Sequence, residues 1–430
     1  MKRVGLISLG CAKNLIDSEM FLATFPKDEY TFCADPYEAD VLILNTCGFI
    51  QDARDEAIGQ LQTIKMMGYH KPLIVTGCFV QKDKKQLQEL FPEVTRFISI
   101  DEYPFFHKIV GEVLNDKTIL PLNPLRRMVS TPPYSAYLRI SEGCDHFCAF
   151  CAIPFIRGRF RSRPFKEIIE EAQDLKAKGV KELFIVSQDT SLYGSDFKDL
   201  NVDIISLLKA LDEMGFYSIR LFYLYPDEID ERFVDFVKNS KSIAHYFDLP
   251  LQSGSSHVLK MMKRVSTNES LRHLVNMIRE KVPDAVIRTT FISGFSSETE
   301  EDHQDTLKFI EDLKFDHLGV FTYSREEGTA GYYILPQVDE DTKRRRRNEI
   351  MELQRRIAHK KNKEWIGKTM EGIVTSKDKD LYALRSYWNA PDDLDGRITF
   401  TSKKDHQPGD IVKIKITDSL IYDLVGEEIA

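Results

Sequence analysis

Cys144, Cys148 and Cys151 lie within the segment GCDHFCAFC, close enough together to ligate one metal centre. A four-iron cubane cluster normally takes four thiolates, so three cysteines leave one iron open to a small molecule. Zinc sites usually contain paired C-x2-C units or added histidines. His146 lies inside the segment and keeps a zinc site of three cysteines and one histidine as an alternative, although its place in the same loop makes it an awkward fourth ligand.

A second set of cysteines is spread over the first part of the chain. Cys11, Cys47 and Cys78 follow the apolar runs VGLISL, VLILN and PLIVTG, each just past the carboxyl end of an expected strand. The ligand crevice of an open α/β sheet lies outside those ends, so we expect the three thiols to meet in one site. The alternative is three unrelated core thiols, since free cysteine is often buried as a small apolar residue. Cys33 follows no such run, and we interpret it as structural.

Apolar runs alternate with helical stretches through residues 1–118 and predict a parallel, flavodoxin-like α/β sheet. Residues 119–133 are expected to form a linker, because proline cannot continue a helix or a central strand. The prolines of this linker are Pro121, Pro124, Pro132 and Pro133.

Residues 134–363 repeat a strand-then-helix unit and predict a partial or complete parallel barrel, with its active site at the carboxyl ends of the strands. In the helical stretch 165–179, Ile168, Ala172 and Leu175 share one face and Gly179 supplies a stop. A long basic helix is expected from about Asp341. The expected strands are AYLRIS, ELFIVS, IRLFYLY, HYFDLPL, VIRTTFIS and HLGVFTYS.

Short alternating segments such as EGIVT, GRITF and DIVKIKI fill residues 364–430 and predict a small all-β barrel. Residues 366–430 contain nine Lys and Arg against twelve Asp and Glu, a net charge of −3. RNA binding draws on phosphate neutralisation by basic groups, so this composition does not favour RNA, although a local basic face would escape the count.

The chain of 430 residues, with 42% hydrophobic and 29% charged residues, is typical of a soluble protein of about three domains. No apolar run approaches the roughly 20 residues of a membrane helix. The first apolar run is short, contains two glycines and is followed by Lys13, so we interpret it as a strand and not as an export signal. We therefore expect a cytoplasmic protein, in which seven cysteines favour metal ligation or catalysis over disulfides.

The segment GCDHFCAFC followed by AIPFIRGRFRSRP resembles the radical S-adenosylmethionine enzymes. Membership implies a βα barrel whose cysteine loop holds a four-iron four-sulfur cluster, with Phe150 at the aromatic position of the loop. The amino and carboxylate groups of S-adenosylmethionine would then be the fourth ligand. The segments SQDT and LPLQ match strand ends that approach this cofactor in the superfamily and imply Gln188, Asp189 and Gln252 as binding residues; ordinary polarity of surface loops is the alternative.

The segments SLGCAKNLIDSE, LNTCGFI and VTGC resemble the methylthiotransferase branch of that superfamily. In this branch three N-terminal cysteines hold a second four-iron cluster, so the resemblance implies Cys11, Cys47 and Cys78 as its ligands. One S-adenosylmethionine would supply the methyl group and another the radical, and a methylthio group would replace a C–H hydrogen. The branch usually has a Pro-Gly turn where this chain has Ser296 and Ser297.

Two substrates are known for this chemistry, an aspartate of the twelfth protein of the small ribosomal subunit and adenosines of transfer RNA. The combination of KNLIDSE with SEGCDHFCAFCAIPFIRGRFRSRP is most similar to the ribosomal-protein branch. The acidic, TRAM-like C-terminal segment agrees with a basic protein substrate. Modification of transfer RNA remains the alternative hypothesis for the substrate. The sequence does not decide whether the protein also contacts ribosomal RNA. A low-potential electron donor is implied as a further partner.

A two-cluster electron carrier is a competitor of another class, but carriers usually ligate every iron with protein. Arg157, Arg159, Arg161 and Arg163 alternate as an extended segment with one charged face would, and could contact a carboxylate, a phosphate or neighbouring acids. The run KRRRR at residues 343–347 is interpreted as a solvated helix face.

Overall fold

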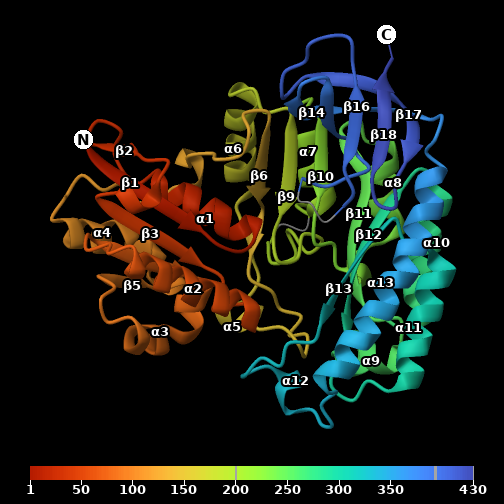
Figure 1. The fold of residues 1–430 in the computed structure, drawn as a ribbon, viewed down its shortest axis with the longest axis horizontal. Helices are drawn as coiled ribbons and strands as arrows, with labels where there is room; N and C mark the ends of the chain where they lie inside the picture. Colours follow the sequence, from red (N-terminus) through yellow and green to blue (C-terminus); the bar gives the residue numbers. More distant parts are fainter. Residues whose placement is uncertain (199–200, 392–394, 430) are drawn as a thin grey trace.

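The computed structural model describes residues 1–198, 201–391 and 395–429, which form an N-terminal α/β part, a central barrel-like part and a C-terminal β-barrel (Figure 1). The N-terminal sheet is parallel, with strand order β2-β1-β3-β4-β5. This order is that of the flavodoxin-like folds, which confirms the expected fold of this part. Its strands are β1 (Lys2–Ser8), β2 (Tyr30–Phe32), β3 (Val41–Thr46), β4 (Leu73–Gly77) and β5 (Arg96–Ile98), and its helices are α1 (Ala12–Leu22), α2 (Gln51–Met66), α3 (Cys78–Leu90) and α4 (Phe106–Leu114).

The central strands of this sheet are buried on both faces. Every residue of β3, VLILNT, and of β4, LIVTG, is buried, as expected for strands covered by helices on each side. At the edge, β2 has three residues and pairs with the start of β1, from Lys2 to Val4. Cys33 therefore lies beside the beginning of β1, far from the carboxyl end that leads to Cys11.

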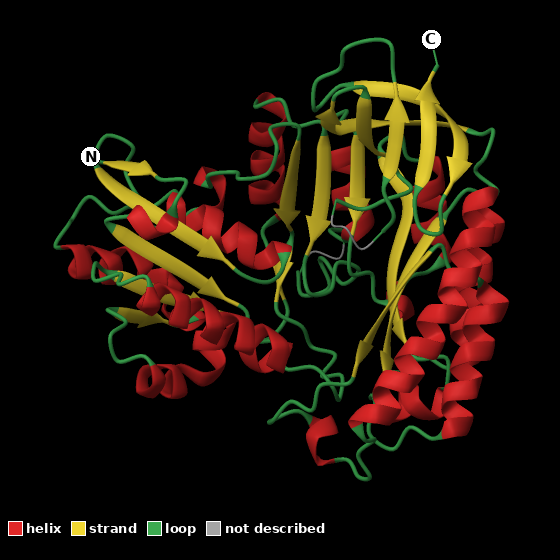
Figure 2. Cartoon of the chain, viewed as in Figure 1, coloured by secondary structure: helices red, strands yellow, loops and turns green. Residues whose placement is uncertain are grey.

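The central part is an open sheet of six parallel strands in the order β13-β12-β11-β10-β9-β6. Its edge strands β6 and β13 do not pair, so the barrel is partial, and Figure 2 shows helices along its outer side. All six expected strands form. They are β6 (Ser135–Arg139), β9 (Glu182–Val186), β10 (Ser218–Leu221), β11 (Ile243–Gln252), β12 (Val286–Ser293) and β13 (His317–Thr322).

The helices of this part pack on the sheet through apolar faces. In α6 (Phe165–Ala177), Ile168, Ala172 and Leu175 are buried as the spacing predicts, and Gly179 follows with a φ of +92°. Side-chain caps fix the first turns of several helices, for example Asp203 before α7 and Thr299 before α11. The other helices are α5 (Ile153–Ile156), α7 (Ile204–Asp212), α8 (Glu231–Asn239), α9 (Ser256–Met261), α10 (Asn268–Lys281), α11 (Glu300–Leu313), α12 (Ala330–Tyr333) and α13 (Glu340–Lys363).

The basic run at the start of α13 is only partly a solvated face. Lys343 and Arg346 are buried, because a spacing of three residues brings both onto the face of α13 that packs against the barrel. Lys343 donates to the Tyr323 carbonyl, and Arg346 pairs with Glu298 at 3.0 Å. Arg344, Arg345 and Arg347 are exposed, so the expectation was right for three residues and wrong for two.

The turn after β12 departs from the family pattern in residue type. Ser297 has a φ of +66°, the left-handed conformation that glycine adopts most readily. Its backbone N–H donates to the Pro336 carbonyl and its hydroxyl to the Leu335 carbonyl. These bonds hold a serine in the turn conformation that the family pattern assigns to glycine.

The C-terminal part is a closed barrel of strand order β14-β15-β16-β18-β17. It packs against the amino ends of the central strands, at the top of Figure 1. Arg385 pairs with Glu182 at the start of β9, and His317 at the start of β13 bonds to the Trp388 carbonyl. Its strands are β14 (Thr369–Asp378), β15 (Leu381–Arg385), β16 (Ile398–Thr401), β17 (Ile411–Ser419) and β18 (Leu424–Glu428).

The linker joins the first two parts closely. Apart from one 3-10 turn at Pro124–Arg126, residues 119–133 form neither helix nor strand. Arg127 is buried and pairs with Glu19 of α1 and Glu171 of α6, each at 2.8 Å. The interface between the N-terminal and central parts is called the seam below. Across it, Glu326 after β13 pairs with Arg54 and Lys82 of the N-terminal part.

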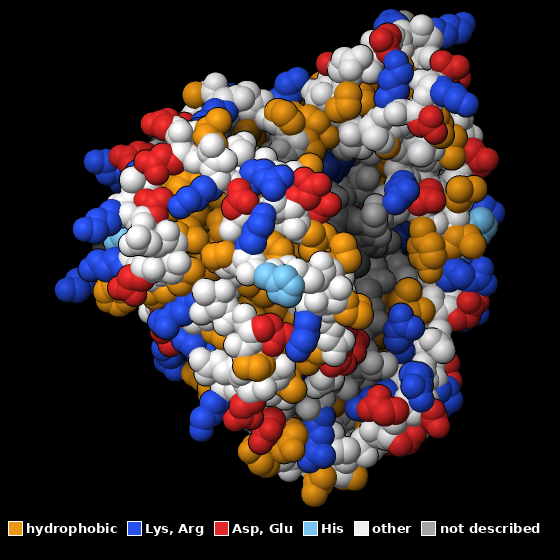
Figure 3. All heavy atoms as spheres, turned by 60° about the vertical axis from the view of Figure 1, so that its left-hand side comes forward, with side chains coloured by type: hydrophobic (Ala, Val, Ile, Leu, Met, Phe, Trp, Pro, Cys, Tyr) orange, Lys and Arg blue, Asp and Glu red, His pale blue; other side chains and the backbone are white. Residues whose placement is uncertain are grey.

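The surface is mixed in charge. On the face drawn in Figure 3, Lys and Arg side chains are interspersed with Asp and Glu. Among the helices of the described residues, none has the length and apolar character needed to cross a membrane.

Candidate active site

The three N-terminal cysteines lie at neighbouring strand ends. Cys11 precedes α1, Cys47 directly follows β3, and Cys78 begins α3 after β4. Because β1, β3 and β4 are adjacent in the sheet, their carboxyl ends bring the thiols together. A Cβ built on Gly10 would lie 3.1 Å from the Cys47 Sγ, which shows how closely the loop before Cys11 approaches Cys47. The structure thus places the three residues at one edge of the sheet, within electrostatic reach of one another, and their joint ligation of one centre stays a prediction.

Asn14 and Arg157 fix this cysteine site from two sides. The Asn14 amide donates to the carbonyls of Leu9 and Thr46, 3.0 Å each, and so ties the loops before Cys11 and Cys47. The Arg157 guanidinium enters from the central part and donates to the Asn14 Oδ1 at 2.6 Å and to the Cys78 Sγ at 3.3 Å.

The three N-terminal thiols differ in electrostatics. Burial opposes ionisation of Cys11, but the Lys13 ammonium, the backbone amide of Asn14 and the Arg157 guanidinium outweigh it, and the pKa of this thiol is lowered. Burial raises the pKa of Cys78 to about 12 despite Arg157, and it also raises the pKa of Cys47. Cys11 is therefore the thiol that the protein prepares best as a thiolate ligand.

The second triad lies in a loop after β6. The two-stranded ladder of β7 (Ser141–Glu142) and β8 (Arg161–Ser162) closes the base of this loop. Burial raises the pKa of Cys144 to about 11 and of Cys151 to about 12; Cys148 raises the pKa of both, and Cys144 also raises that of Cys151. The three thiols therefore lie within electrostatic reach of one another at the carboxyl end of β6.

His146 is engaged away from the thiols. Its Nε2 lies 2.5 Å from the Asp189 Oδ2, and its ring stacks on Tyr225 with centroids 3.6 Å apart. Among the described residues, the group whose ligand atoms all lie within 4.8 Å is Glu300, His303 and Glu349, and not a cysteine triad. These facts argue against the single-zinc alternative. The Glu300 group already binds the Arg345 guanidinium.

Gln188 and Asp189, at the end of β9, hold the loop of the second triad. The Gln188 Oε1 accepts from the Gly143 N–H at 3.0 Å, and its Nε2 donates to Glu142 at 2.6 Å. The Asp189 Oδ1 accepts from the Ser191 hydroxyl, and its other oxygen contacts the histidine of the loop. The structure thus brings these two residues to the site, with their polar atoms engaged by protein groups.

Phe150 lies inside this loop, and Gln252 lies at the carboxyl end of strand β11. Phe150 packs against a small apolar cluster that includes Ala149 and Phe295. Gln252 ends β11 with a φ of +73°, after a register shift against β12. Such a bulge re-aims the side chain that follows it.

Arg264 is a site residue that the sequence did not reveal. It is 9% exposed and stacks on the Tyr225 ring at 4.4 Å, and its Nη2 donates to the Pro250 carbonyl. Its Nε and Nη1 are buried without a hydrogen-bond partner in the described structure. Cys148 is the leading cause that raises the pKa of this guanidinium against its burial. A buried guanidinium with free donors next to a cysteine loop is suited to an anionic ligand.

The four alternating arginines do not form one charged face. Arg157 follows the one-turn helix α5 and is buried against Asp17 of α1 at 2.7 Å, whereas Arg159 is exposed and pairs with Asp145. Arg163 pairs with Glu171, and Arg161 is exposed. The expectation of a continuous extended segment is wrong because α5 turns the chain before it. The reading in which the arginines pair with acids is confirmed for three of them.

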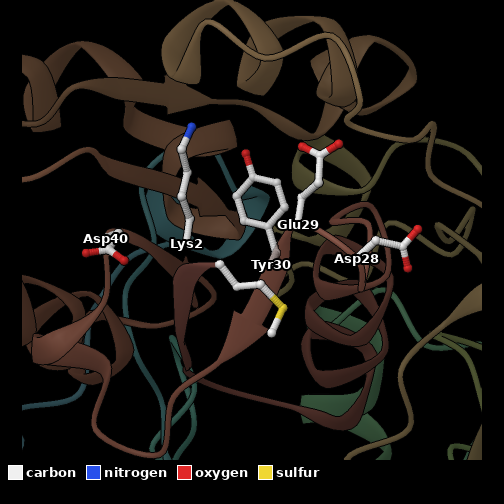
Figure 4. A pocket seen from close by; sticks show the side chains of 6 residues that line it. Lys2, Asp28, Glu29, Tyr30 and Asp40 are labelled. Carbon is white, nitrogen blue, oxygen red and sulfur yellow. The ribbon is translucent and has the colours of Figure 1, made fainter.

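A shallow cavity at the amino ends of β1 and β2 lies away from both triads (Figure 4). In it, the side chains of Asp28 and Asp40 lie on opposite sides of Lys2 and Tyr30. Parallel sheets bind ligands at the carboxyl ends of their strands, so this cavity is not the candidate site.

Gly143 is needed for the shape of the second cysteine loop. Its φ is +78°, and a Cβ there would lie 2.1 Å from the Arg159 carbonyl oxygen. We expect Gly143→Ala to lower the free energy of unfolding by about 1 to 3 kcal/mol more than Gly179→Ala, because overpacking adds to the backbone strain. Gly179 is the matched control, with a φ of +92° and open space at its Cβ position. Thermal unfolding of the metal-free proteins measures the difference, and equal losses would contradict this role of Gly143.

Three sequence models of known families match the chain. The radical SAM superfamily matches residues 138–310, the uncharacterized protein family UPF0004 matches residues 3–99, and the TRAM domain matches residues 366–429. These matches fall on the central barrel, the N-terminal sheet and the C-terminal barrel, in that order.

Curated relatives match over nearly the full length. The protein named ribosomal protein uS12 methylthiotransferase RimO of Aquifex aeolicus is 42% identical, with 99% of this chain and 97% of the relative covered. The protein of the same name from Thermoanaerobacter sp. is 41% identical, with 99% and 100% covered.

Two solved structures share the fold. TsrM, a radical S-adenosylmethionine methyltransferase of Kitasatospora setae, superimposes with a TM-score of 0.56 at 12% identity when cobalamin and a [4Fe-4S] cluster are bound, over 89% of this chain and 77% of that one. With tryptophan and aza-SAM bound, the TM-score is 0.54 at 14% identity, over 74% and 73%.

Proposed function

The chain belongs to the ribosomal protein uS12 methylthiotransferase family, and on that basis we propose that it replaces a β-carbon hydrogen of an aspartate in uS12 with a methylthio group. The observation that carries this proposal is the presence of two separate cysteine triads, one at the carboxyl ends of each parallel sheet. A single triad would suffice to start radical chemistry, whereas the transfer of sulfur needs a second site.

We propose that Cys144, Cys148 and Cys151 hold one [4Fe-4S] cluster and that Cys11, Cys47 and Cys78 hold the other. Both triads suit this role, since neither is disulfide-bonded and each leaves a four-iron cluster one ligand short. When bound, the cluster at Cys144, Cys148 and Cys151 would supply the radical together with S-adenosylmethionine. The cluster at Cys11, Cys47 and Cys78 would supply the sulfur, which another S-adenosylmethionine would methylate. A low-potential electron donor is required as a partner.

The residues of the chain would orient these groups. The guanidinium of Arg264, with two free donors beside Cys148, suits the carboxylate of S-adenosylmethionine. Phe150 and Gln252 would line the cofactor pocket. Gln188 and Asp189 would border it while they fix the Cys144 loop and His146. Arg157 would hold Cys78 and so keep the two sites in register.

The transfer-RNA alternative is not favoured, because the curated relatives compared above are named for uS12. The mixed charge on the face of Figure 3 and the net charge of −3 on residues 366–430 agree with a protein substrate. The hypothesis of an electron carrier provides no ligand for the Nε and Nη1 donors of Arg264, which are buried without a hydrogen-bond partner.

The proposal is tested by mass spectrometry after anaerobic reaction of the cluster-loaded enzyme with S-adenosylmethionine, reductant and sulfide. Recombinant uS12 and undermodified transfer RNA are supplied together. We expect a methylthio mass gain on uS12 that maps to one aspartate. A methylthio mass gain on a transfer-RNA adenosine would show that the substrate is transfer RNA and that the reaction is the same. No mass gain on either substrate, with intact clusters, would reject the proposal.

A further inference from the structure

Lys13 is a buried lysine that lies between the two cysteine triads. It stands two residues after Cys11, at the start of α1, and is 8% exposed. Its Nζ donates to the carbonyl of Ser187, at 3.3 Å, on the far side of the seam. The next residue, Gln188, accepts from the N–H of Gly143, which precedes Cys144. One side chain thus reaches from the first triad to the residues that hold the second.

Among the described residues, the Lys13 ammonium forms no salt bridge with a carboxylate, and its charge acts on the Cys11 thiol. Within the described part of the chain it has no carboxylate within 4.0 Å, and a carbonyl oxygen carries no net charge. The other buried cations of the seam are paired. Arg157 and Arg139 bind Asp17, and Arg127 binds Glu19. An ammonium has three N–H donors, and the contacts of Lys13 with one carbonyl and one ring face leave donor capacity for an anionic ligand.

Tyr223 fixes the direction of this lysine. The Lys13 Nζ lies 3.6 Å from the centroid of the Tyr223 ring, in cation–π contact. Tyr223 itself follows β10 with a φ of +59°, an unfavourable conformation for an aromatic residue that is typically retained where a site needs it. Its N–H donates to Asp248 at 2.9 Å and its carbonyl accepts from the Thr190 N–H at 3.1 Å, so the strained backbone is held on both sides.

We propose that the Lys13 ammonium binds the side-chain carboxylate of the substrate aspartate and so selects aspartate and presents its β-carbon between the two triads. The inference rests on the proposed function, in which the reacting carbon must be reached from both triads. The carboxylate of aspartate is one bond from its β-carbon, so a cation for it belongs at the seam. Among the described residues, Lys13 is the buried cation at this position that forms no salt bridge with a carboxylate, while Arg264 lies beside Cys148 and is assigned to the cofactor.

The test compares binding of two proteins, recombinant uS12 and uS12 whose target aspartate is replaced by asparagine. Affinities are measured without reductant for the cluster-loaded enzyme and for Lys13→Met, which keeps the length of the side chain and removes its charge. Lys13→Arg keeps the charge. The control is Lys27→Met, which changes an exposed lysine of the same part of the chain. Iron content and production of 5′-deoxyadenosine without uS12 are measured on each variant.

We expect the wild type and Lys27→Met to bind the aspartate form at least about 10-fold more tightly than the asparagine form, because a charge pair replaces a neutral contact. Lys13→Met should bind both forms equally and weakly, and Lys13→Arg should restore part of the preference. A purely structural role of Lys13 would not change this preference.

The outcomes separate the inference from the proposed function. A Lys13→Met variant that keeps the full preference, or a wild type with no preference, would overturn the role of Lys13 while uS12 modification stands. Should Lys13→Met lose iron, the wild-type enzyme still tests the inference, because equal affinity for the aspartate and asparagine forms of uS12 would contradict it. Failure of the wild type to modify uS12 at all would instead reject the proposed function.

Discussion

Cys47→Ala is expected to abolish methylthio transfer to uS12 while leaving reductive cleavage of S-adenosylmethionine in place. Cys47 belongs to the N-terminal triad, and its removal leaves the loop of Cys144 intact. Changes to residues that merely support metal ligands cost about 10- to 100-fold, so loss of a ligand should lower the transfer rate by more than about 100-fold. The measurement is the rate of methylthio gain beside the rate of 5′-deoxyadenosine production.

Cys148→Ala should lose both activities, because the proposed radical site loses a ligand. The matched control is Cys33→Ala, since Cys33 lies beside the beginning of β1 and outside both triads. It should retain the iron content and both rates. If Cys47→Ala also stopped 5′-deoxyadenosine production, the division of labour between the triads would be wrong.

Arg157→Met is expected to destabilise the metal-free protein by about 3 kcal/mol, because loss of one partner leaves a buried charge uncompensated. Asp17 is 1% exposed, and its pKa is lowered because Arg157 and Arg139 outweigh the effect of burial. Arg139 still pairs with Asp17 at 2.6 Å in this variant. The loss of stability should therefore lie at the lower end of the range for a broken buried ion pair. Chemical denaturation measures the loss.

Arg159→Met provides the control for this change. The side chain of Arg159 is 68% exposed and pairs with the half-exposed Asp145, and surface pairs contribute about 0.2 to 1 kcal/mol. A loss for Arg157→Met no larger than for Arg159→Met would show that the bridge between α1 and the cysteine loop does not stabilise the seam. Iron content of both variants reports whether Cys78 keeps its position.

The positions of the cysteines at strand ends could be predicted from the sequence because they depend on local rules. Cys11, Cys47 and Cys78 follow strands that are consecutive in a parallel sheet, and parallel strands bring their carboxyl ends to one edge. Cys144, Cys148 and Cys151 are close in the chain itself. The six strands of the partial barrel were equally accessible to prediction, since each is a short apolar run followed by a helical pattern.

The contacts across the seam could not be predicted in this way. Arg157 looked like one of four alternating arginines, but the short helix α5 turns it towards Asp17. Lys13 and Arg264 gain their environment from residues far away in the chain, namely Ser187 and the Tyr225 ring. Lys343 and Arg346 could have been assigned to the inner face of α13 from helical periodicity, had the run of charge not favoured solvent.

The pairing of Asp17 with Arg157 also sets the order in which the new protein matures on the ribosome that makes it. The two residues are 140 positions apart, an interval of about 7 to 28 s at a synthesis rate of about 5 to 20 residues/s. All five strands of the N-terminal sheet emerge before then, whereas the barrel loop that carries Arg157 does not. Cys78 and Arg157 are 79 positions apart, so for about 4 to 16 s at that rate the nascent chain presents all three thiols at a sheet edge that the central part does not yet cover, where oxygen can reach them.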